Sequence, residues 1–542
     1  MTSGSELAAM EGRKFGLDQA MTGLSFVLLL VIVAIPIFMI VYNAFFYEGK
    51  FDISLFVSVI GNMDNLKAMW NTIVIALAVT LFGTIMGLFY AWLLGRSDIP
   101  AKGFMRAMFT IPYMFPPFFG AMAWDLLFSG RAGYVNKWLM ATFHLASAPI
   151  NINSIGGIIF VECSYYFPFV FMQVVSALER MDPTLEESAR IAGAKQGQVI
   201  AKITIPLVKP AISAGALLIL ISSLAHFGVP SILGFSKNIY TLPTMIYALI
   251  YKSSGSFEGI RQGAALSILL VAVALVIQKR VLSSGSYDII KGKSMRPTLI
   301  KLRGAKYPLL AFACLTLIVI VVVPLVMIFL VALVNAYGLP LTPENFSLKN
   351  YQKVLTSTAT LDSIKNSLFL SVTAGIVCMF LGVMVAYVIN RIKPKGKGIL
   401  EILSVLPYSI PGTVLAIGVI LSWSGSIFGI KLYNTIWIIL VAYMARYLSF
   451  SMKSASASLQ QVNSSLEEAS RACGATHTES LKDITLPLIR PAMVSGFFLI
   501  FLPAMRELTT SILLYGPYTR TLGVQIYSLR DAGMIPQASA LA

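Results

Sequence analysis

The sequence is dominated by apolar runs of about 20 residues or more, long enough to cross the hydrocarbon core of a bilayer. In lipid, every backbone N–H and C=O must be satisfied within the chain, so only helices and closed barrels span it. The runs are continuously apolar rather than alternating, which favours helices over an outer-membrane barrel. Because 57% of the residues are apolar and only 12% are charged, a soluble fold would lack a polar surface. We therefore expect an all-α polytopic membrane protein.

Eleven candidate spans follow from these runs, six in the first half of the chain and five in the second. Prolines in Ile111–Phe118 and Leu406–Gly412 are expected to kink the third and ninth spans. In chain order, the predicted spans are Thr22–Phe46, Asn71–Leu94, Phe104–Phe128, Ile155–Leu178, Ala211–Phe235, Gly263–Leu282, Tyr307–Ala336, Asn366–Ile389, Ile399–Trp423, Tyr433–Ser454 and Ala492–Tyr515.

The net charge of +17 is explained by membrane topology rather than by a nucleic-acid partner. Basic residues gather before the first span and between spans two and three, six and seven, and eight and nine. All of these segments lie on one side if the N-terminus is cytoplasmic, as the positive-inside rule expects. The first 20 residues lead into the first span without a small-residue cleavage site, so this helix is expected to stay uncleaved.

Two polar segments repeat each other. Leu185–Gly215 and Leu466–Gly496 are identical at 13 of 31 aligned positions. Upstream, Asn71 and Arg96 correspond to Asn366 and Arg391 at a second register. Two six-helix halves in parallel duplication are predicted: residues 1–282, a basic cytoplasmic linker 283–306, and residues 307–542. The equivalent of the sixth span would begin near residue 537, so we expect its helix to be missing; a natural eleven-span protein is the alternative.

Each polar segment is expected to form two short helices separated by a glycine turn. In the first, Asp182 is a good N-cap and Glu186 and Glu187 occupy the first turn. Gly193 permits a left-handed turn, and a second helix is expected to end near Thr204, before prolines that begin the next span. The second segment repeats this order. Such helices suit docking on a cytoplasmic partner; the alternative of an ordinary interfacial loop is disfavoured by the two copies with equal spacing.

The spacing of these residues resembles the EAA motif of permease subunits of ATP-binding-cassette (ABC) importers. The pattern is a glutamate, a glycine six positions on, an isoleucine ten beyond and a proline three further. The resemblance covers both halves and implies two fused permease domains whose motifs form the helices that couple to an ATPase. The implied coupling residues are Glu186, Glu187, Ala189, Gly193, Ile203 and Pro206, and Glu467, Glu468, Ser470, Gly474, Ile484 and Pro487.

The resemblance also implies partners, location and cargo. These are an ATPase homodimer that binds ATP and Mg²⁺, a periplasmic or lipid-anchored substrate-binding protein, and a bacterial inner membrane. The chain has no phosphate loop of its own: Gly292-Lys293-Ser294 lacks the required earlier glycine, where Tyr287 stands. We expect no ATPase activity and no bound cofactor. Chain length most resembles the ferric-iron branch, with thiamine or 2-aminoethylphosphonate as alternatives, moved by alternating access.

Ionisable residues at membrane depth are candidates for the translocation pathway. They are Asp125, Glu162, His226, Arg506 and Glu507, and His226 aligns with Glu507 at the register of the polar segments. Interhelical hydrogen bonding is the alternative role. An ion-coupled secondary transporter is the rival class, although it has no use for two docking segments. No catalytic motif is present, and the cysteines and histidines have no metal-ligand spacing.

Overall fold

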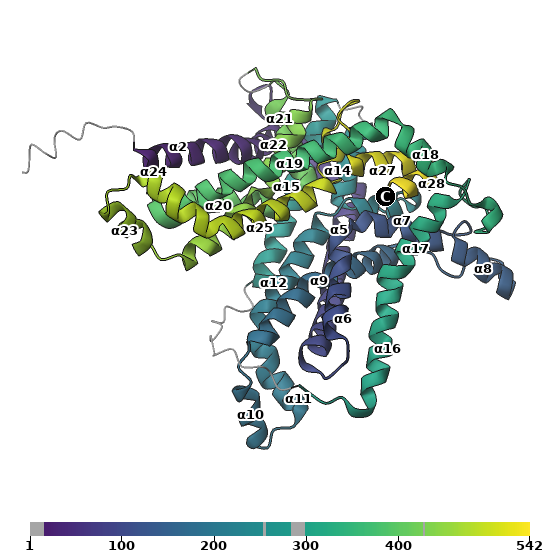
Figure 1. Cartoon of the computed structure of the whole chain (residues 1–542). Coiled ribbons are helices and arrows are strands. Elements are labelled where there is room, and N and C mark those ends of the chain that lie inside the picture. Colours follow the sequence, from purple (N-terminus) through teal and green to yellow (C-terminus); the bar gives the residue numbers. More distant parts are fainter. Residues whose placement is uncertain (1–15, 253–255, 283–298, 426–428) are drawn as a thin grey trace, which may run out of the picture. The chain divides into compact units, whose positions relative to one another are not determined.

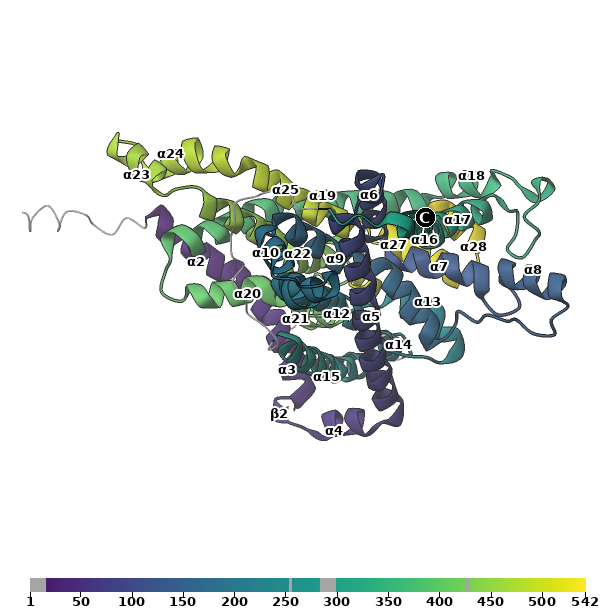
Figure 2. The same cartoon turned by 90° about the horizontal axis from the view of Figure 1, so that it is seen from below.

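The computed structural model describes residues 16–252, 256–282, 299–425 and 429–542. Within these ranges the chain is helical, apart from one antiparallel pair of short strands, β1 (Phe46–Tyr47) and β2 (Lys50–Phe51), and isolated bridges. Figures 1 and 2 show the helices from two directions. The all-α polytopic class is thus confirmed. Residues 283–298, most of the predicted linker, lie outside the described residues.

Nine helices of the described chain are long and apolar enough to cross a membrane, or ten if one bent pair counts as a single span. They correspond to predicted spans 1, 2, 4 to 8, 10 and 11, and the bent pair to span 9. The third and ninth spans are broken rather than merely kinked. Pro116 separates two short helices, with Phe115 extended before it, as a following proline requires. At Pro411 the bend reaches 112°.

The chain forms two compact units. Unit 2 contains Asp52–Ser357 and the segment from Ile526 onward, and its centre is the packing of α5, α9 and α12 (Figure 1). Its elements are α4 (Ser54–Gly61), α5 (Met63–Arg96), α6 (Lys102–Met114), α7 (Pro117–Phe128), α8 (Tyr134–Phe143), α9 (Ile155–Arg180), α10 (Thr184–Ile191), α11 (Gln196–Val199), η2 (Ile200–Thr204), α12 (Ile205–Leu224), α13 (Gly228–Gly234), η3 (Phe235–Lys237), α14 (Leu242–Lys252), α15 (Phe257–Leu282), η4 (Arg303–Ala305), α16 (Lys306–Leu317), η5 (Ile318–Val322), α17 (Val323–Leu333), η6 (Pro343–Asn345), α18 (Lys349–Thr356) and α28 (Ile535–Leu541). Figure 2 shows α8 extending beyond α7.

Unit 1 contains the residues up to Phe51 together with Thr358–Gln525. Here α19, α22 and α25 pack as α5, α9 and α12 do in unit 2. Its elements are α2 (Leu17–Leu29), η1 (Leu30–Ala34), α3 (Ile35–Phe45), β1, β2, α19 (Thr358–Tyr387), η7 (Val388–Ile392), α20 (Lys397–Ser409), α21 (Gly412–Trp423), α22 (Ile436–Gln461), α23 (Ser465–Ala472), α24 (His477–Ser480), η8 (Leu481–Thr485), α25 (Leu486–Met505), α26 (Ser511–Leu514) and α27 (Leu522–Asp531), whose last residues belong to unit 2.

The first and seventh spans are exchanged between the repeats. The first span, α2 to α3, packs on α19, α20 and α21 of the second repeat, where a Cβ on Gly418 would lie 2.6 Å from the carbonyl oxygen of Pro36. The seventh span, α16 to α17, packs on α7 and α28, and its π turn η5 contacts α6. The units therefore group residues by contact, whereas the repeat groups them by chain order, and the permease-domain boundaries 1–282 and 307–542 stay a prediction.

Glycines let the three central helices of each unit approach closely. A Cβ on Gly215 of α12 would lie 2.6 Å from the Cα of Val170 in α9, and one on Gly87 of α5 would lie 2.8 Å from the carbonyl oxygen of Phe167. In unit 1, a Cβ on the equivalent Gly382 of α19 would lie 2.7 Å from the Cβ of Ser451 in α22. The hydrophobic effect does not drive helices together in lipid, because lipid tails are as apolar as the side chains. Small residues at helix crossings instead allow close van der Waals packing.

Replacing Gly215 by alanine is therefore expected to destabilise the protein by about 1–3 kcal/mol, because backbone must move to admit the methyl group. The measurement is the thermal unfolding midpoint of the purified chain in detergent. Gly103→Ala is the matched control, since nothing lies within 4 Å of a Cβ there. Equal midpoints for the two variants would contradict the packing argument.

Candidate functional site

The candidate site consists of the two repeated polar segments, which we call the first island (residues 182–204) and the second island (residues 463–485). The first contains α10, α11 and the π turn η2; the second contains α23, α24 and the π turn η8. Figure 1 shows α10 and α11 at one end of the α9 and α12 helices, and α23 and α24 at one end of α25. Each island thus lies at the end of the long helices of its own unit.

Each island begins with a side-chain turn just before its first helix. The Asp182 carboxylate accepts hydrogen bonds from the backbone N–H (2.9 Å) and the hydroxyl (2.7 Å) of Thr184. The backbone bond, followed by the hydroxyl bond, holds the pKa of Asp182 below its ordinary value. In the second island, the Asn463 side chain accepts from the N–H of Ser465 at 3.1 Å. The N-caps themselves are Pro183 and Ser464, without a side-chain cap hydrogen bond, so the predicted N-cap at Asp182 is wrong by one residue.

The predicted left-handed glycine turns are present. Gly193 has φ +86° and Gly474 has φ +93°, a conformation that costs a glycine nothing. The N–H of Ala194 then bonds to the carbonyl of Ala189 at 2.9 Å, and that of Ala475 to the carbonyl of Ser470 at 3.2 Å, which satisfies carbonyls at the helix end. No heavy atom lies within 4 Å of a Cβ on either glycine, so both turns face open space.

Burial follows the same pattern in both islands. The motif glutamates Glu187 and Glu468 are exposed, whereas the preceding Glu186 and Glu467 are buried. Ala189 and Ser470 are half-buried; so are Ile203 and Ile484, while Pro206 and Pro487 are exposed. The sequence analysis assigned both glutamates of each pair to one acidic first turn. In the structure, one carboxylate of each pair is buried and the other is exposed.

The second helix of each island does not end before the next span, contrary to the prediction. Gln196–Leu224 is one continuous apolar helix, and so is His477–Met505. In both, a π turn precedes the proline, Pro206 or Pro487. The wider turn accommodates a residue that has no N–H to donate, so the helix continues. Each island is thereby joined to a span without a flexible hinge.

Glu186 is the centre of a buried cluster in the first island. Its carboxylate pairs with the guanidinium of Arg96, the last residue of α5, and the two side chains are only 2% and 1% exposed. The other oxygen accepts from the hydroxyl of Thr204 at 2.6 Å, and Arg190 lies 3.9 Å away. The cluster ties α10 to the end of the second span and to the π turn.

Glu467 is held in the same way in the second island. Nε of Arg391 lies 3.3 Å from its carboxylate, and the Thr485 hydroxyl donates to it at 2.8 Å. Arg391 also donates to the carbonyls of Leu459 and Val462, and its side chain is 16% exposed. Tyr387 adds a hydroxyl bond to Glu467 at 3.1 Å.

Sequence reasoning found the glutamates and glycines but not their partners. Arg96 and Arg391 appeared as markers of the repeat register and of the basic segments, and Thr204 was taken as a helix end. The signal was available: an arginine, a glutamate and a threonine recur at corresponding positions of both repeats. Their pairing needed the fold, because 90 residues separate Arg96 from Glu186 and 76 separate Arg391 from Glu467.

The ionisable residues at membrane depth pair within their own repeat. In unit 2, Glu162 of α9 is fully buried, accepts from the Ser223 hydroxyl and lies 3.0 Å from Nδ1 of His226. In unit 1, Glu507 accepts from the Tyr447 hydroxyl and from the N–H of Thr510 at 2.8 Å, and lies 3.9 Å from Nε of Arg446. In each repeat, then, a polar pair joins the fourth helix of the repeat to the end of the fifth.

The other two pathway candidates lie elsewhere. Asp125, near the end of α7, pairs with Arg530 at 3.1 Å and accepts from Asn153 at 2.9 Å. Burial, and then the Asp125 charge, raises the pKa of the loop residue Tyr337 to about 12. Arg506 is half-buried at the end of α25. Among the described residues, no group of three or more His, Cys, Asp and Glu side chains is placed to hold a metal ion.

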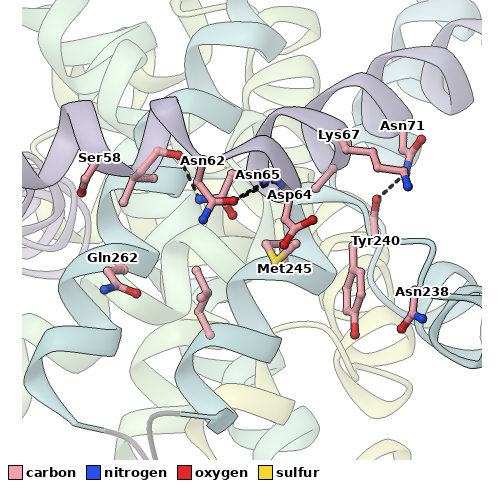
Figure 3. A pocket seen from close by; sticks show the side chains of 13 residues that line it. Ser58, Asn62, Asp64, Asn65, Lys67, Asn71, Asn238, Tyr240, Met245 and Gln262 are labelled. Carbon is pink, nitrogen blue, oxygen red and sulfur yellow. Dashed lines mark hydrogen bonds between the residues drawn. The ribbon is translucent and has the colours of Figure 1, made fainter.

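A polar pocket of about 600 Å³ lies away from the islands, in unit 2, where α4 meets α5 and the loop before α14 (Figure 3). Its amides mostly serve the backbone: Asn71 donates to the carbonyl of Tyr240 at 2.9 Å, Asn65 donates to that of Val59, and Asn62 caps α5. The second repeat has an equivalent of the Asn71 contact, since Asn366 donates to the carbonyl of Tyr518 at 3.0 Å. The pocket is thus part of a junction between the second span of a repeat and its outer loop.

Fold and site together define a class of protein. A polytopic helical chain with two equal islands, each rigidly continuous with a span, is a permease subunit of an ABC importer. The chain belongs to the family of binding-protein-dependent transport system inner membrane components, which its residues 378–542 match. It is a multi-pass inner-membrane protein and a transport subunit without an ATPase site of its own.

Relatives establish the duplication. The chain is 31% identical over 219 residues to the molybdenum transport system permease protein ModB of Escherichia coli, covering 39% of this chain and 92% of ModB. It is 26% identical over 543 residues to the ferric transport system permease protein FbpB of Actinobacillus pleuropneumoniae, covering 98% and 76%. It is 24% identical over 459 residues to the Fe(3+)-transport system permease protein FbpB 2 of Haemophilus influenzae, covering 84% and 83%. The chain is therefore a fused double permease.

Proposed function

We propose that the two islands dock on the two subunits of an ATPase homodimer, and that this permease moves a small solute through the inner membrane. That partner binds ATP and Mg²⁺ and hydrolyses the ATP. It lies on the cytoplasmic side, where the N-terminus of this chain also lies. This chain itself binds no cofactor. The observation that carries the proposal is the repeated cluster: each island is fixed by a buried glutamate, an arginine and a threonine, with a glycine turn left open.

The continuous helices suggest how docking is transmitted. Because α11, η2 and α12 form one helix, and α24, η8 and α25 another, a displaced island moves a whole span with it. Closure of the ATPase dimer would bring the islands together and tilt these spans, exchanging inward- and outward-facing states. The partners need only bind the two states with different affinity.

Ferric iron delivered by a periplasmic or lipid-anchored binding protein is the proposed cargo. Support comes from the long relatives, which are ferric transport permeases aligned over most of this chain. Thiamine and 2-aminoethylphosphonate are the alternatives. The polar pairs of Glu162 with His226 and of Arg446 with Glu507, together with Asp125 and Arg506, remain proposed contributors to the translocation pathway.

Docking is tested by a pull-down of the detergent-extracted chain with the ATPase subunit encoded beside it. The variant combines Gly193→Asp with Gly474→Asp. Both sites have open space around a Cβ, but their positive φ strains any side chain. Aspartate tolerates the left-handed region better than most residues, so each substitution adds a charge to the docking surface at a modest local strain. We expect at least a tenfold loss of binding.

Gly533→Asp is the matched control, because Gly533 also has a positive φ (+75°) and open space around its Cβ, and lies outside the islands. Binding by the control but not by the double variant supports the islands as the docking sites. Undiminished binding by the double variant contradicts them. Solute uptake driven by an ion gradient, with no ATPase present, would instead favour the secondary transporter.

A further inference from the structure

The cytoplasmic start of the first span contacts the second island. Asp18, in the first turn of α2, lies 3.1 Å from Nδ1 of His477, the first residue of α24. Nε2 of His477 lies 3.0 Å from the Tyr387 hydroxyl, which donates to Glu467 at 3.1 Å. A chain of polar contacts thus runs from the first span to the buried glutamate of the island, entirely within unit 1.

The hydrogen bonds of this chain set the orientation of His477. Tyr387 has one hydroxyl proton and gives it to the Glu467 carboxylate, so Nε2 of His477 must donate to the Tyr387 oxygen. Nδ1 lies beside the Asp18 carboxylate, within ion-pair distance but without a hydrogen bond to Oδ1. The imidazole ring therefore lies between α2 and the residues that hold Glu467.

The start of the seventh span contacts the first island's support in a parallel way. Lys306, the first residue of α16, lies 3.3 Å from the Asp98 carboxylate, and the N–H of Leu302 donates to Asp98 at 2.9 Å. These bonds, the backbone one first, hold the pKa of Asp98 below its ordinary value. Backbone bonds join Ile300 to Arg96 (2.8 Å) and to Asp98 (3.1 Å). Arg96 is the residue that holds Glu186.

We propose that these two contacts are latches, in which the starts of the exchanged spans fix the islands in the orientation that docks. Asp18 with His477 and Lys306 with Asp98 are then positioning residues for energy coupling, and the proposal rests on the docking function above. The carboxylate belongs to the span in one latch and to the island's support in the other. Only the latch on the second island contains a histidine, and that position is Gln196 in the first repeat.

The test measures the Kd of the full-length detergent-extracted chain for its ATPase subunit. A latch that sets the fraction of correctly oriented islands changes the apparent Kd by the inverse of that fraction. For Asp18→Asn and for His477→Gln we expect a Kd raised about threefold or more. Asp98→Asn keeps the acceptor for Leu302 but loses the charge facing Lys306, so it should raise the Kd as well.

Reversing the pair, as Asp98→Lys with Lys306→Asp, should recover part of what Asp98→Lys alone loses, which a folding defect would not do. Wild-type Kd values in the Asp18 and His477 variants would overturn the latches and leave island docking intact. If the Gly193→Asp, Gly474→Asp variant also binds normally, the docking function itself fails, so the two outcomes are distinct.

Discussion

Arg96→Ala is expected to lower the free energy of unfolding by about 3–5 kcal/mol, because it removes the nearest counter-charge of the buried Glu186 carboxylate. The Thr204 hydroxyl remains as a partner but carries no charge, and the half-buried Arg190 lies 3.9 Å away. Arg391→Ala in the second repeat should cost less, since Arg391 is 16% exposed and Tyr387 also bonds Glu467. The measurement is denaturant unfolding of both variants in the same detergent.

A double variant separates charge from shape. Arg96→Met with Glu186→Met fills the site with apolar side chains, and such replacements of a buried pair are often neutral or stabilising. We expect it to be more stable than Arg96→Ala but unable to hold α10 in its specific orientation, so ATPase binding should fall. An Arg96→Ala variant as stable as the wild type would show that the pair does not anchor the island.

Glu507→Leu should also destabilise by about 3–5 kcal/mol, because it removes the acceptor shared by the Tyr447 hydroxyl and the Thr510 N–H and the counter-charge near Arg446. Glu507→Gln should cost less, since an amide oxygen still accepts. In the first repeat His226→Leu should behave like Glu507→Leu, as it leaves Glu162 buried with only the Ser223 hydroxyl. Thermal unfolding of the purified variants gives these values.

Ferric-iron uptake per folded molecule then distinguishes the two roles of these pairs. If Glu507→Gln and His226→Leu reduce uptake beyond their loss of folded protein, the pathway proposal is supported. If uptake simply follows the amount of folded protein, the pairs act as braces between helices and the pathway proposal is contradicted. Gly103→Ala, in open space on another helix, provides the reference.

How much of the fold the sequence predicts depends on how local the signal is. The spans followed from apolar runs, and the prolines predicted kinks in the third and ninth spans, where the structure has breaks at Pro116 and Pro411. The exchange of the first and seventh spans did not follow. Both helices are apolar all round, with exposed residues such as Val27 and Leu315, so their periodicity marks no face for a particular neighbour.

The site shows the same division. The spacing of Glu187 and Gly193 is a local signal that can be found in one repeat. The same spacing of Glu468 and Gly474 in the other repeat supports it. The inward turn of Glu186, its neighbour, depends on the phase of α10 against Arg96, which the chain brings together from a distance. His477 carried no repeat signal, because its counterpart is Gln196. Only its contacts with Asp18 and Tyr387 single it out.

The exchange of spans has a consequence for the order of synthesis. The seventh span is made after α6 and α7, so these partners are waiting when it enters the membrane, and α28 is added only at the end of the chain. The first span cannot form its native contacts until α21 has been made, because Pro36 packs closely against Gly418 of that helix. At about 5–20 residues per second, the more than 360 residues between them take roughly 20–70 s to synthesise. During that interval α2 and α3 lie in the bilayer without their native neighbours, so lipid alone must keep them from pairing wrongly.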